Sequence, residues 1–148
     1  MDYDGTLLGG NCIIRRDDLA RVGPYNTSLH RAQDHDMYLR LLQAGAKGKY
    51  VPDLIIWHLI HPTRVTKAYF RRWCFVYGRS MMFMDRAHPE PVARLLGIPR
   101  HVVGAAIRKT ITLVPRLLRS GTRASLLFDA ELDWWTLAGF VRERIGAR

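Results

Sequence analysis

The sequence has few cysteines and no long apolar run. Its two cysteines, Cys12 and Cys74, form neither a Cys-x-x-Cys pair nor a zinc-ligand spacing, so we expect free thiols in a reducing compartment. No segment reaches the roughly 18 uninterrupted apolar residues that are typical of a membrane-spanning helix. The amino terminus lacks the basic start and apolar core of a signal peptide. Any contact with a membrane is therefore expected to be peripheral.

Acidic charge is also scarce. The chain carries 23 Lys and Arg against 13 Asp and Glu, a net charge of +10. A surplus of this size predicts an anionic partner, and composition alone leaves nucleic acid, an acidic membrane surface and a phosphorylated substrate open. A hydrophobic content of 48% over 148 residues is enough for one folded domain with a core.

Apolar periodicity and turn residues predict a chain that contains both helices and short strands. We expect extended segments over 11–15, 47–52 and 53–58, and helices over 17–23, 30–45, 65–84 and 125–146. The helix over 65–84 is expected to have a thick aromatic face and a basic face.

The most informative segment is residues 30–45, a short amphipathic helix that Gly45 is expected to close in the left-handed conformation. Two carboxylates, Asp34 and Asp36, stand at its start. Unpaired amides and the helix dipole favour acids there, so capping explains one of them. Asp36 and Arg40 are four residues apart and are expected to pair along the exposed side of the helix. Two carboxylates around His35 are more than capping requires.

Residues 91–124 contain seven Lys and Arg and no acid, interleaved with large aliphatic side chains. This composition is typical of an amphipathic helix at a membrane interface, interrupted here at Pro99 and Pro115. No helix-turn-helix, zinc-finger or RNP-type motif is present, so a membrane surface is favoured and nucleic acid is not expected. We predict two parts, 1–86 and 87–148, the second being a basic helical tail on an anionic membrane surface.

Two other patterns carry weaker signals. A divalent metal site of a hydrolase would need the side chains of His30, His35, His58 and Asp36 to meet, and their spacing is loose. The Asp-x-Asp at residues 2–4 has the form that holds metal and diphosphate in nucleotide-sugar enzymes. It has no preceding strand, and we expect it to be a frayed tail.

Four motifs occur in a characteristic order. They are Gly9-Gly10-Asn11 with Arg15-Arg16, then Val22-Gly23-Pro24-Tyr25, then Gln33-Asp34-His35-Asp36 with Arg40-Leu41, and finally Tyr50-Val51-Pro52-Asp53 with Trp57-His58. Their succession, over residues 7 to 80, resembles the C-terminal, acceptor-side half of family 2 glycosyltransferases. That resemblance implies an α/β fold, half of a Rossmann-like GT-A domain, followed by an α-helical extension.

The resemblance also implies roles for single residues. Asp34 matches the catalytic base of inverting members, which takes the proton of the acceptor hydroxyl as it attacks the anomeric carbon of the sugar. His58 matches a strand-end histidine that contacts metal or diphosphate. Arg71 and Arg72 faintly match an arginine element of processive members, although a solvated basic helix face explains them equally well. The residues placed at the substrate are Gly9, Gly10, Asn11, Gln33, Asp36, Arg71 and Arg72.

Two departures limit the implied activity. Gln33 stands where the family has Glu, and the half that binds the nucleotide and carries the true Asp-x-Asp is missing. We therefore expect this chain alone not to bind a nucleotide sugar, and to need a separate N-terminal half. The complete enzyme would use a nucleotide-sugar donor, a glycan or lipid-linked acceptor and Mg²⁺ or Mn²⁺. It would build cell-envelope polysaccharide from the cytoplasmic face of the membrane.

A protein of another class remains open at this point, namely a non-catalytic basic module that binds a membrane or nucleic acid. Convergence of Asp34, His58 and Gly10 in one cleft would favour the enzyme. A flat basic face without such a cleft would favour the binding module.

Overall fold

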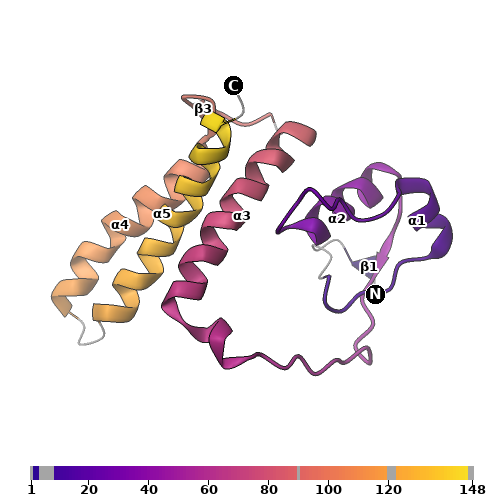
Figure 1. The fold of residues 1–148 in the computed structure, drawn as a ribbon, viewed down its shortest axis with the longest axis horizontal. Helices are drawn as coiled ribbons and strands as arrows, with labels where there is room; N and C mark the ends of the chain where they lie inside the picture. Colours follow the sequence, from indigo (N-terminus) through magenta and orange to yellow (C-terminus); the bar gives the residue numbers. More distant parts are fainter. Residues whose placement is uncertain (1, 4–8, 90, 120–122, 147–148) are drawn as a thin grey trace. The chain divides into compact units, whose positions relative to one another are not determined.

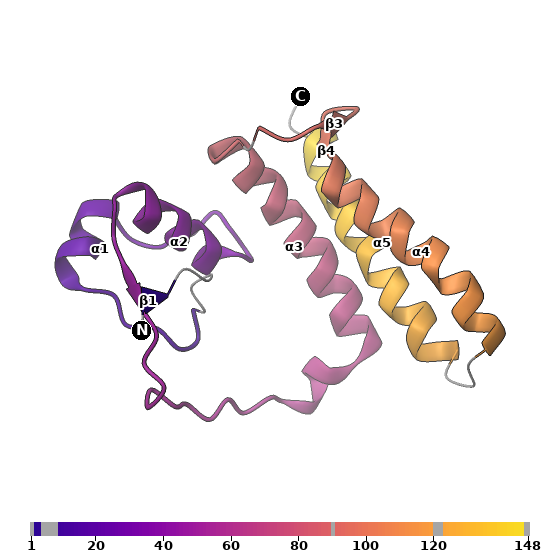
Figure 2. The same ribbon diagram turned by 180° about the vertical axis from the view of Figure 1, so that it is seen from behind.

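The computed structural model describes residues 2–3, 9–89, 91–119 and 123–146. The chain divides into two compact units, Met1–Leu59 and Ile60–Arg148, coloured from indigo to yellow along the sequence in Figure 1 and seen from behind in Figure 2. Both helices and strands are present, but the strands are two-residue pairs in two separate sheets. The fold is therefore mixed, with much more helix than sheet.

The first unit contains two short helices and one small antiparallel sheet. Its elements are β1 (Asp2–Tyr3), α1 (Arg16–Val22), α2 (Gln33–Gln43) and β2 (Gly48–Lys49). Tyr3 pairs with Gly48, so the start of the chain is in a strand and is not the frayed tail expected from the sequence. Asp4, the second acid of the Asp-x-Asp, lies outside the described residues.

Helix α2 lies within the range 30–45 predicted from the sequence, beginning three residues later at Gln33 and ending before Gly45 as expected. Gly45 has φ +73°, and the amides of Gly45 and Ala46 donate to the carbonyls of Leu42 and Leu41. These two bonds are those of a Schellman motif, which satisfies the last carbonyls of a helix. The expected left-handed stop is confirmed. On the inner face of the helix, Met37 is fully buried with Leu29 and Leu41 in a small core.

The extended segments predicted over 11–15 and 53–58 are not strands in the structure. A strand requires a hydrogen-bonded neighbour, and the described residues offer these segments only one lateral bond, from the Asn11 side chain to the Leu54 carbonyl at 2.9 Å. The segment 47–52 contributes only the two residues of β2. Pro52 follows in a turn, as its missing amide requires.

The second unit is built from three long helices. Its elements are the 3₁₀ helix η1 (Pro62–Val65), α3 (Lys67–Ala87), the hairpin β3 (Arg94–Leu95) and β4 (Ile98–Pro99), α4 (Arg100–Arg119) and α5 (Arg123–Gly146). Helix α5 lies between α3 and α4 in both views. This compact unit begins at residue 60, whereas the sequence-based division was placed at 86/87, because α3 packs against α5.

Two glycines allow α3 and α5 to cross in backbone contact. A Cβ atom built on Gly78 would lie 1.9 Å from the carbonyl oxygen of Thr136, and one on Gly139 would lie 1.9 Å from that of Phe75. No side chain fits in either place. Phe140, beside this crossing, is 1% exposed.

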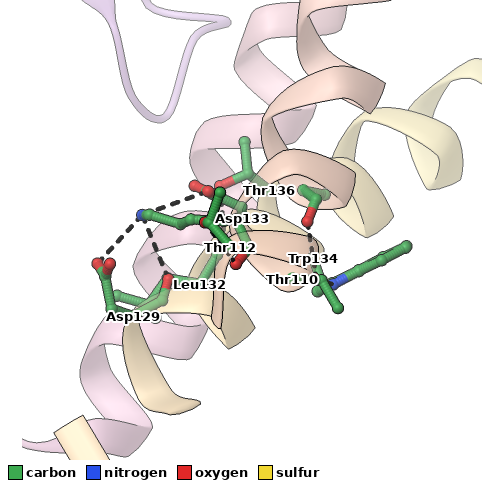
Figure 3. A network of polar contacts seen from close by, with 9 residues as sticks. Thr110, Thr112, Asp129, Leu132, Asp133, Trp134 and Thr136 are labelled. Atoms are coloured by element: carbon green, nitrogen blue, oxygen red, sulfur yellow. Dashed lines mark hydrogen bonds and ion pairs between the residues drawn. The ribbon is translucent and has the colours of Figure 1, made fainter. Parts of the chain in front are cut away.

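Ion pairs join the helices around this core. Arg71 and Arg79 of α3 pair with Glu131 and Glu143 of α5, both at 2.6 Å. Lys109 of α4 contacts Asp129 at 3.1 Å and Asp133 at 3.3 Å, in the network of Figure 3. Burial lowers the pKa of Lys109, but the hydrogen bonds with the two aspartates outweigh it and raise the pKa. Each pair is partly exposed, so its contribution to stability is modest.

The predicted interruption of the basic stretch at Pro115 is wrong. Helix α4 runs continuously from Arg100 to Arg119 with Pro115 inside it, near its end. Pro115 is exposed, so the carbonyl that loses its helical hydrogen bond to the proline can be solvated. Pro99 does mark a boundary, since it ends β4 directly before α4. Within the described residues, no helix is long and apolar enough to cross a membrane.

Candidate functional site

Asp34 lies in the first turn of α2 with its carboxylate held by backbone amides. Its Oδ2 accepts a hydrogen bond from the Gly9 amide at 3.2 Å, and its Oδ1 accepts one from the His35 amide at 3.0 Å. The side chain is half-buried and has no ion-pair partner among the described residues. The helix begins without a side-chain cap, because its N-cap residue, Ala32, has no side-chain acceptor. Asp34 therefore supplies the negative charge that this helix start favours.

Gly9 packs closely against the Asp34 side chain, whereas Gly10 does not. A Cβ on Gly9 would lie 3.0 Å from the Asp34 Cβ, which is tighter than an ordinary contact, and 3.5 Å from its Oδ2. A Cβ on Gly10 would meet nothing within 4 Å. The predicted glycine-rich approach to the site thus places one glycine against Asp34. Gly5, at the start of the same stretch, lies outside the described residues.

Asp36 and Arg40 form the predicted pair, but the pair is not on the exposed side. Asp36 is 4% exposed, and its Oδ2 accepts from the Arg40 Nε at 2.9 Å. The Arg40 guanidinium also donates to the carbonyls of Val22 at 2.6 Å and Pro24 at 3.0 Å. Arg40 thereby fastens the turn after α1 onto α2. A buried carboxylate bonded in this way favours a structural role for Asp36, and its substrate contact stays a prediction.

The fastened turn carries Tyr25, a residue to which the sequence assigned no role. Its hydroxyl lies 3.9 Å from the Cys12 sulfur. Burial raises the pKa of Tyr25, and the nearby Cys12 and the Asp34 charge raise it further. Tyr25 is therefore a neutral hydroxyl in the electrostatic neighbourhood of the candidate base. The signal that could have identified it was the Val-Gly-Pro-Tyr turn, which was noted only as a motif.

Two further predicted substrate residues are occupied by backbone contacts. The Gln33 amide donates to the Leu29 carbonyl at 2.6 Å, which ties the start of α2 to the preceding loop. The Asn11 amide donates to Leu54, as described above. Both lie in the same unit as Asp34. Contact of either with a substrate stays a prediction.

Arg71 and Arg72 belong to the second unit. Arg71 makes a two-point contact with Glu131, from Nε at 2.6 Å and from Nη2 at 3.0 Å. This hydrogen bond raises the pKa of Arg71 and, with that from Trp135, lowers the pKa of Glu131 to about 2. Arg72 is exposed. The charge of Arg71 is accounted for by its ion pair with Glu131, which joins α3 to α5. A substrate role for either arginine stays a prediction.

The described residues do not bring metal ligands together. Among residues 2–3, 9–89, 91–119 and 123–146, no three His, Cys, Asp or Glu side chains meet as a metal site requires. The hydrolase hypothesis needed His30, His35, His58 and Asp36 to converge, and they do not. His35 instead lies beside Tyr38, with ring centroids 6.2 Å apart. His58 is exposed, so as a metal contact it stays a single-residue prediction.

The segment around His58 exposes large apolar side chains. The exposed fractions are 73% for Ile55, 94% for Trp57 and 92% for Leu59, and Ile13 on the segment near Asn11 is 82% exposed. A contiguous exposed apolar patch is typical of an interaction surface, so these side chains are candidates for contact with a partner.

Comparison with known proteins shows a partial similarity: over 84 residues, 57% of the chain, the sequence is 30% identical to a glycosyltransferase. The matched proteins are the pre-mycofactocin glycosyltransferases of two strains of Mycobacterium tuberculosis. The chain spans 17% of their length. No family model matches the sequence, and no solved structure matches it significantly. A glycosyltransferase relationship is supported at this level.

Proposed function

We propose that residues 9–59 form the acceptor side of a glycosyltransferase active site, with Asp34 as the general base. The complete enzyme would transfer a sugar from a nucleotide-diphospho-sugar to an acceptor hydroxyl. One observation carries the proposal. Of the two carboxylates at the start of α2, Asp36 is buried and bonded to Arg40, whereas Asp34 is half-buried and, among the described residues, is bonded to the amides of Gly9 and His35 alone. Asp34 therefore keeps acceptor capacity for a proton.

In the proposed reaction, the acceptor oxygen attacks the anomeric carbon while its proton passes to the Asp34 carboxylate. The bond from that carbon to the diphosphate breaks, and the nucleotide diphosphate leaves with the electron pair. The Gly9 amide orients one carboxylate oxygen, and the positive end of α2 stabilises the ionised form before the transfer. Gly10 and Asn11 directly follow Gly9 in the sequence and are proposed to face the substrate.

The described residues do not build a site for the Mg²⁺ or Mn²⁺ ion that the resemblance implies. Such an ion would neutralise the departing diphosphate. The proposal keeps His58 as a single contact to that ion or to the diphosphate and derives no step from it.

We further propose that a nucleotide-binding half covers the surface formed by Ile13, Ile55, Trp57 and Leu59. Two observations support this: these four side chains are exposed, and the chain spans only 17% of the length of the glycosyltransferases that it matches. In the full-length protein, maleimide should label Trp57→Cys much more slowly than Leu96→Cys, which is 87% exposed in the second unit. Equal labelling rates, located by mass spectrometry, would contradict a covering half.

The test of the base is sugar transfer by the full-length enzyme carrying Asp34→Asn, with Asp17→Asn as the matched control. Asp17 is an exposed acid in the first turn of α1. Loss of a general base should lower the turnover number by about 10²- to 10⁴-fold, while Asp17→Asn leaves it unchanged. Circular dichroism verifies that both variants fold. Wild-type turnover in Asp34→Asn would remove Asp34 from this role.

A non-catalytic binding module is the second candidate, and one observation favours it. Residues 1–59 contain seven Lys and Arg and seven Asp and Glu, whereas residues 60–148 contain 16 and six. The whole net charge therefore belongs to the helical unit, and the unit that contains Asp34 has no net charge.

A further inference from the structure

The helical unit has more bases than acids, and each acid that the structure describes there is already paired with a base. Its described acids are all in ion pairs: Asp85 with Arg94, Asp129 and Asp133 with Lys109, Glu131 with Arg71, and Glu143 with Arg79. Arg100 and Arg108 of α4 are exposed and form no ion pair with the described residues. The electrostatic field of this unit is therefore that of its unpaired bases.

Helix α4 turns one face to α5 and the other to solvent. Val102 and Ala106 are buried on the inner face. On the outer face, Ile107 is 43% and Ile111 65% exposed. Because residues three, four and seven apart share a helix face, Arg100 and Arg108 lie beside these two isoleucines. A solvent-facing stripe thus combines aliphatic and basic side chains.

Helix α5 extends this stripe. The indole Nε1 of Trp134 donates to the Thr110 hydroxyl of α4 at 2.9 Å (Figure 3). Since Thr110 is three residues from Ile107, this bond places the Trp134 ring next to the isoleucines. Trp134 is 45% exposed, and Leu127, seven residues earlier on the same side of α5, is 50% exposed.

We propose that this outer face, formed by Arg100, Ile107, Arg108, Ile111, Leu127 and Trp134, docks on an anionic lipid bilayer. The aliphatic side chains and the indole enter the headgroup region, and the two arginines meet lipid phosphates. Tryptophan with one polar end anchored suits that boundary. The inference goes beyond glycosyl transfer and does not depend on it.

The composition of the face favours lipid over other occupants. Nucleic acid is bound chiefly through phosphate contacts from polar and basic side chains, and the centre of this face is aliphatic. A second copy related by a two-fold axis would place Arg100 and Arg108 of both copies in one interface, which costs repulsion between like charges. A bilayer with anionic headgroups matches both the apolar centre and the basic flank.

This face differs from the membrane contact predicted from the sequence over 91–124. Val102, Ala106 and Lys109 lie within that range but contact α5, so they are excluded from the contact. Leu127 and Trp134 lie beyond it and are included. The difference follows from the packing of α4 against α5, which periodicity within one helix does not reveal.

The test is co-sedimentation of the full chain with phosphatidylglycerol/phosphatidylcholine vesicles and with vesicles of phosphatidylcholine alone. The double variant Arg100→Gln, Arg108→Gln removes two bases from the face. The matched control, Arg72→Gln with Arg86→Gln, removes two exposed bases from α3. We expect the face variant to weaken binding to the anionic vesicles by about 30-fold, roughly fivefold per base. The control should lose several-fold less, since its charges lie outside the contact.

A second pair separates the apolar contribution from the charge. Ile111→Ser should lower vesicle binding by about tenfold, and Val65→Ser, similarly exposed at 63% in η1, should leave it unchanged. Circular dichroism verifies the helix content of each variant.

Several results would overturn the proposal. These are equal losses in the face and control variants, equal binding to neutral vesicles, or no vesicle binding by the wild-type chain. Dimerisation in light scattering that Ile111→Ser abolishes, without vesicle binding, would assign the face to a second copy instead. None of these results bears on the proposed sugar transfer, which is measured separately in the full-length enzyme with a water-soluble acceptor.

Discussion

The two units of this chain differ in both charge and packing. The first, Met1–Leu59, has equal numbers of acids and bases, a small core around Met37 and several exposed apolar side chains. The second, Ile60–Arg148, carries the whole net charge of +10 on three closely packed helices. A chain-wide average therefore misleads, because the surplus charge says nothing about the unit that holds the candidate base.

Different interactions also stabilise each unit internally. In the first, one buried ion pair with three backbone carbonyls fastens the turn after α1 to α2 through Arg40. In the second, α3 and α5 meet backbone to backbone at Gly78 and Gly139. A small unit with little core depends on hydrogen bonds such as those of Arg40. Long helices that bury much surface can instead pack closely through glycines.

The largest effect is expected where the helices touch. Gly78→Ala would drive a methyl group into the Thr136 carbonyl, so α3 and α5 must separate. We expect a loss of about 3 kcal/mol in the free energy of unfolding, measured by urea denaturation of the helical signal. Gly104→Ala on α4 is the matched control, since its Cβ meets nothing within 4 Å. That substitution should add up to about 1 kcal/mol of helix propensity.

Equal changes in the free energy of unfolding of Gly78→Ala and Gly104→Ala would show that the glycine crossing does not stabilise the second unit. The three-helix packing would then depend on the ion pairs and aromatic contacts alone.

The next effect tests the polar fastening of the first unit. Arg40→Leu leaves the Asp36 carboxylate without its partner and frees the carbonyls of the turn, so we expect a loss of about 2 kcal/mol. Amide hydrogen exchange should accelerate in α2 and in residues 22–25. Arg21→Leu breaks only an exposed pair with Asp18 and should cost about 0.5 kcal/mol or less. Unchanged exchange in Arg40→Leu would remove the fastening role.

A smaller effect concerns pH. The hydrogen bond from Arg71 lowers the pKa of Glu131 from 4.5 to about 2. The folded state therefore binds this proton more weakly than the unfolded state, and the stabilisation is present above pH 4.5 and lost as the pH falls towards 2. The melting temperature of the wild type should exceed that of Glu131→Gln at neutral pH, and the gap should close in acid. A gap that stays constant with pH would contradict the pairing.

Local features of the sequence predicted the helices well. Gly45 and the four-residue spacing of Asp36 and Arg40 identified the end and an internal pair of α2, because both depend only on helix geometry. Long periodic segments likewise identified α3 and α5. The burial of Asp36 was not predictable, because it depends on residues distant in sequence that close over α2.

What sequence reasoning missed depends on contacts between elements. Spacing did not show that Arg71 pairs with Glu131, 60 residues away, or that Gly78 faces Gly139 across a helix crossing. The strand over 11–15 was overpredicted because extended sequence becomes a strand only beside a neighbour. Tyr25 was missed because a turn motif does not show which of its side chains points to the site.

The most direct test of the division between the two units compares two variants in two assays. The account predicts that Asp34→Asn lowers the turnover number of the full-length enzyme by about 10²- to 10⁴-fold and leaves its binding to anionic vesicles unchanged. It predicts that Arg100→Gln with Arg108→Gln weakens vesicle binding by about 30-fold and leaves sugar transfer to a water-soluble acceptor unchanged. Loss of both activities in either folded variant, or full transfer by Asp34→Asn, would contradict it.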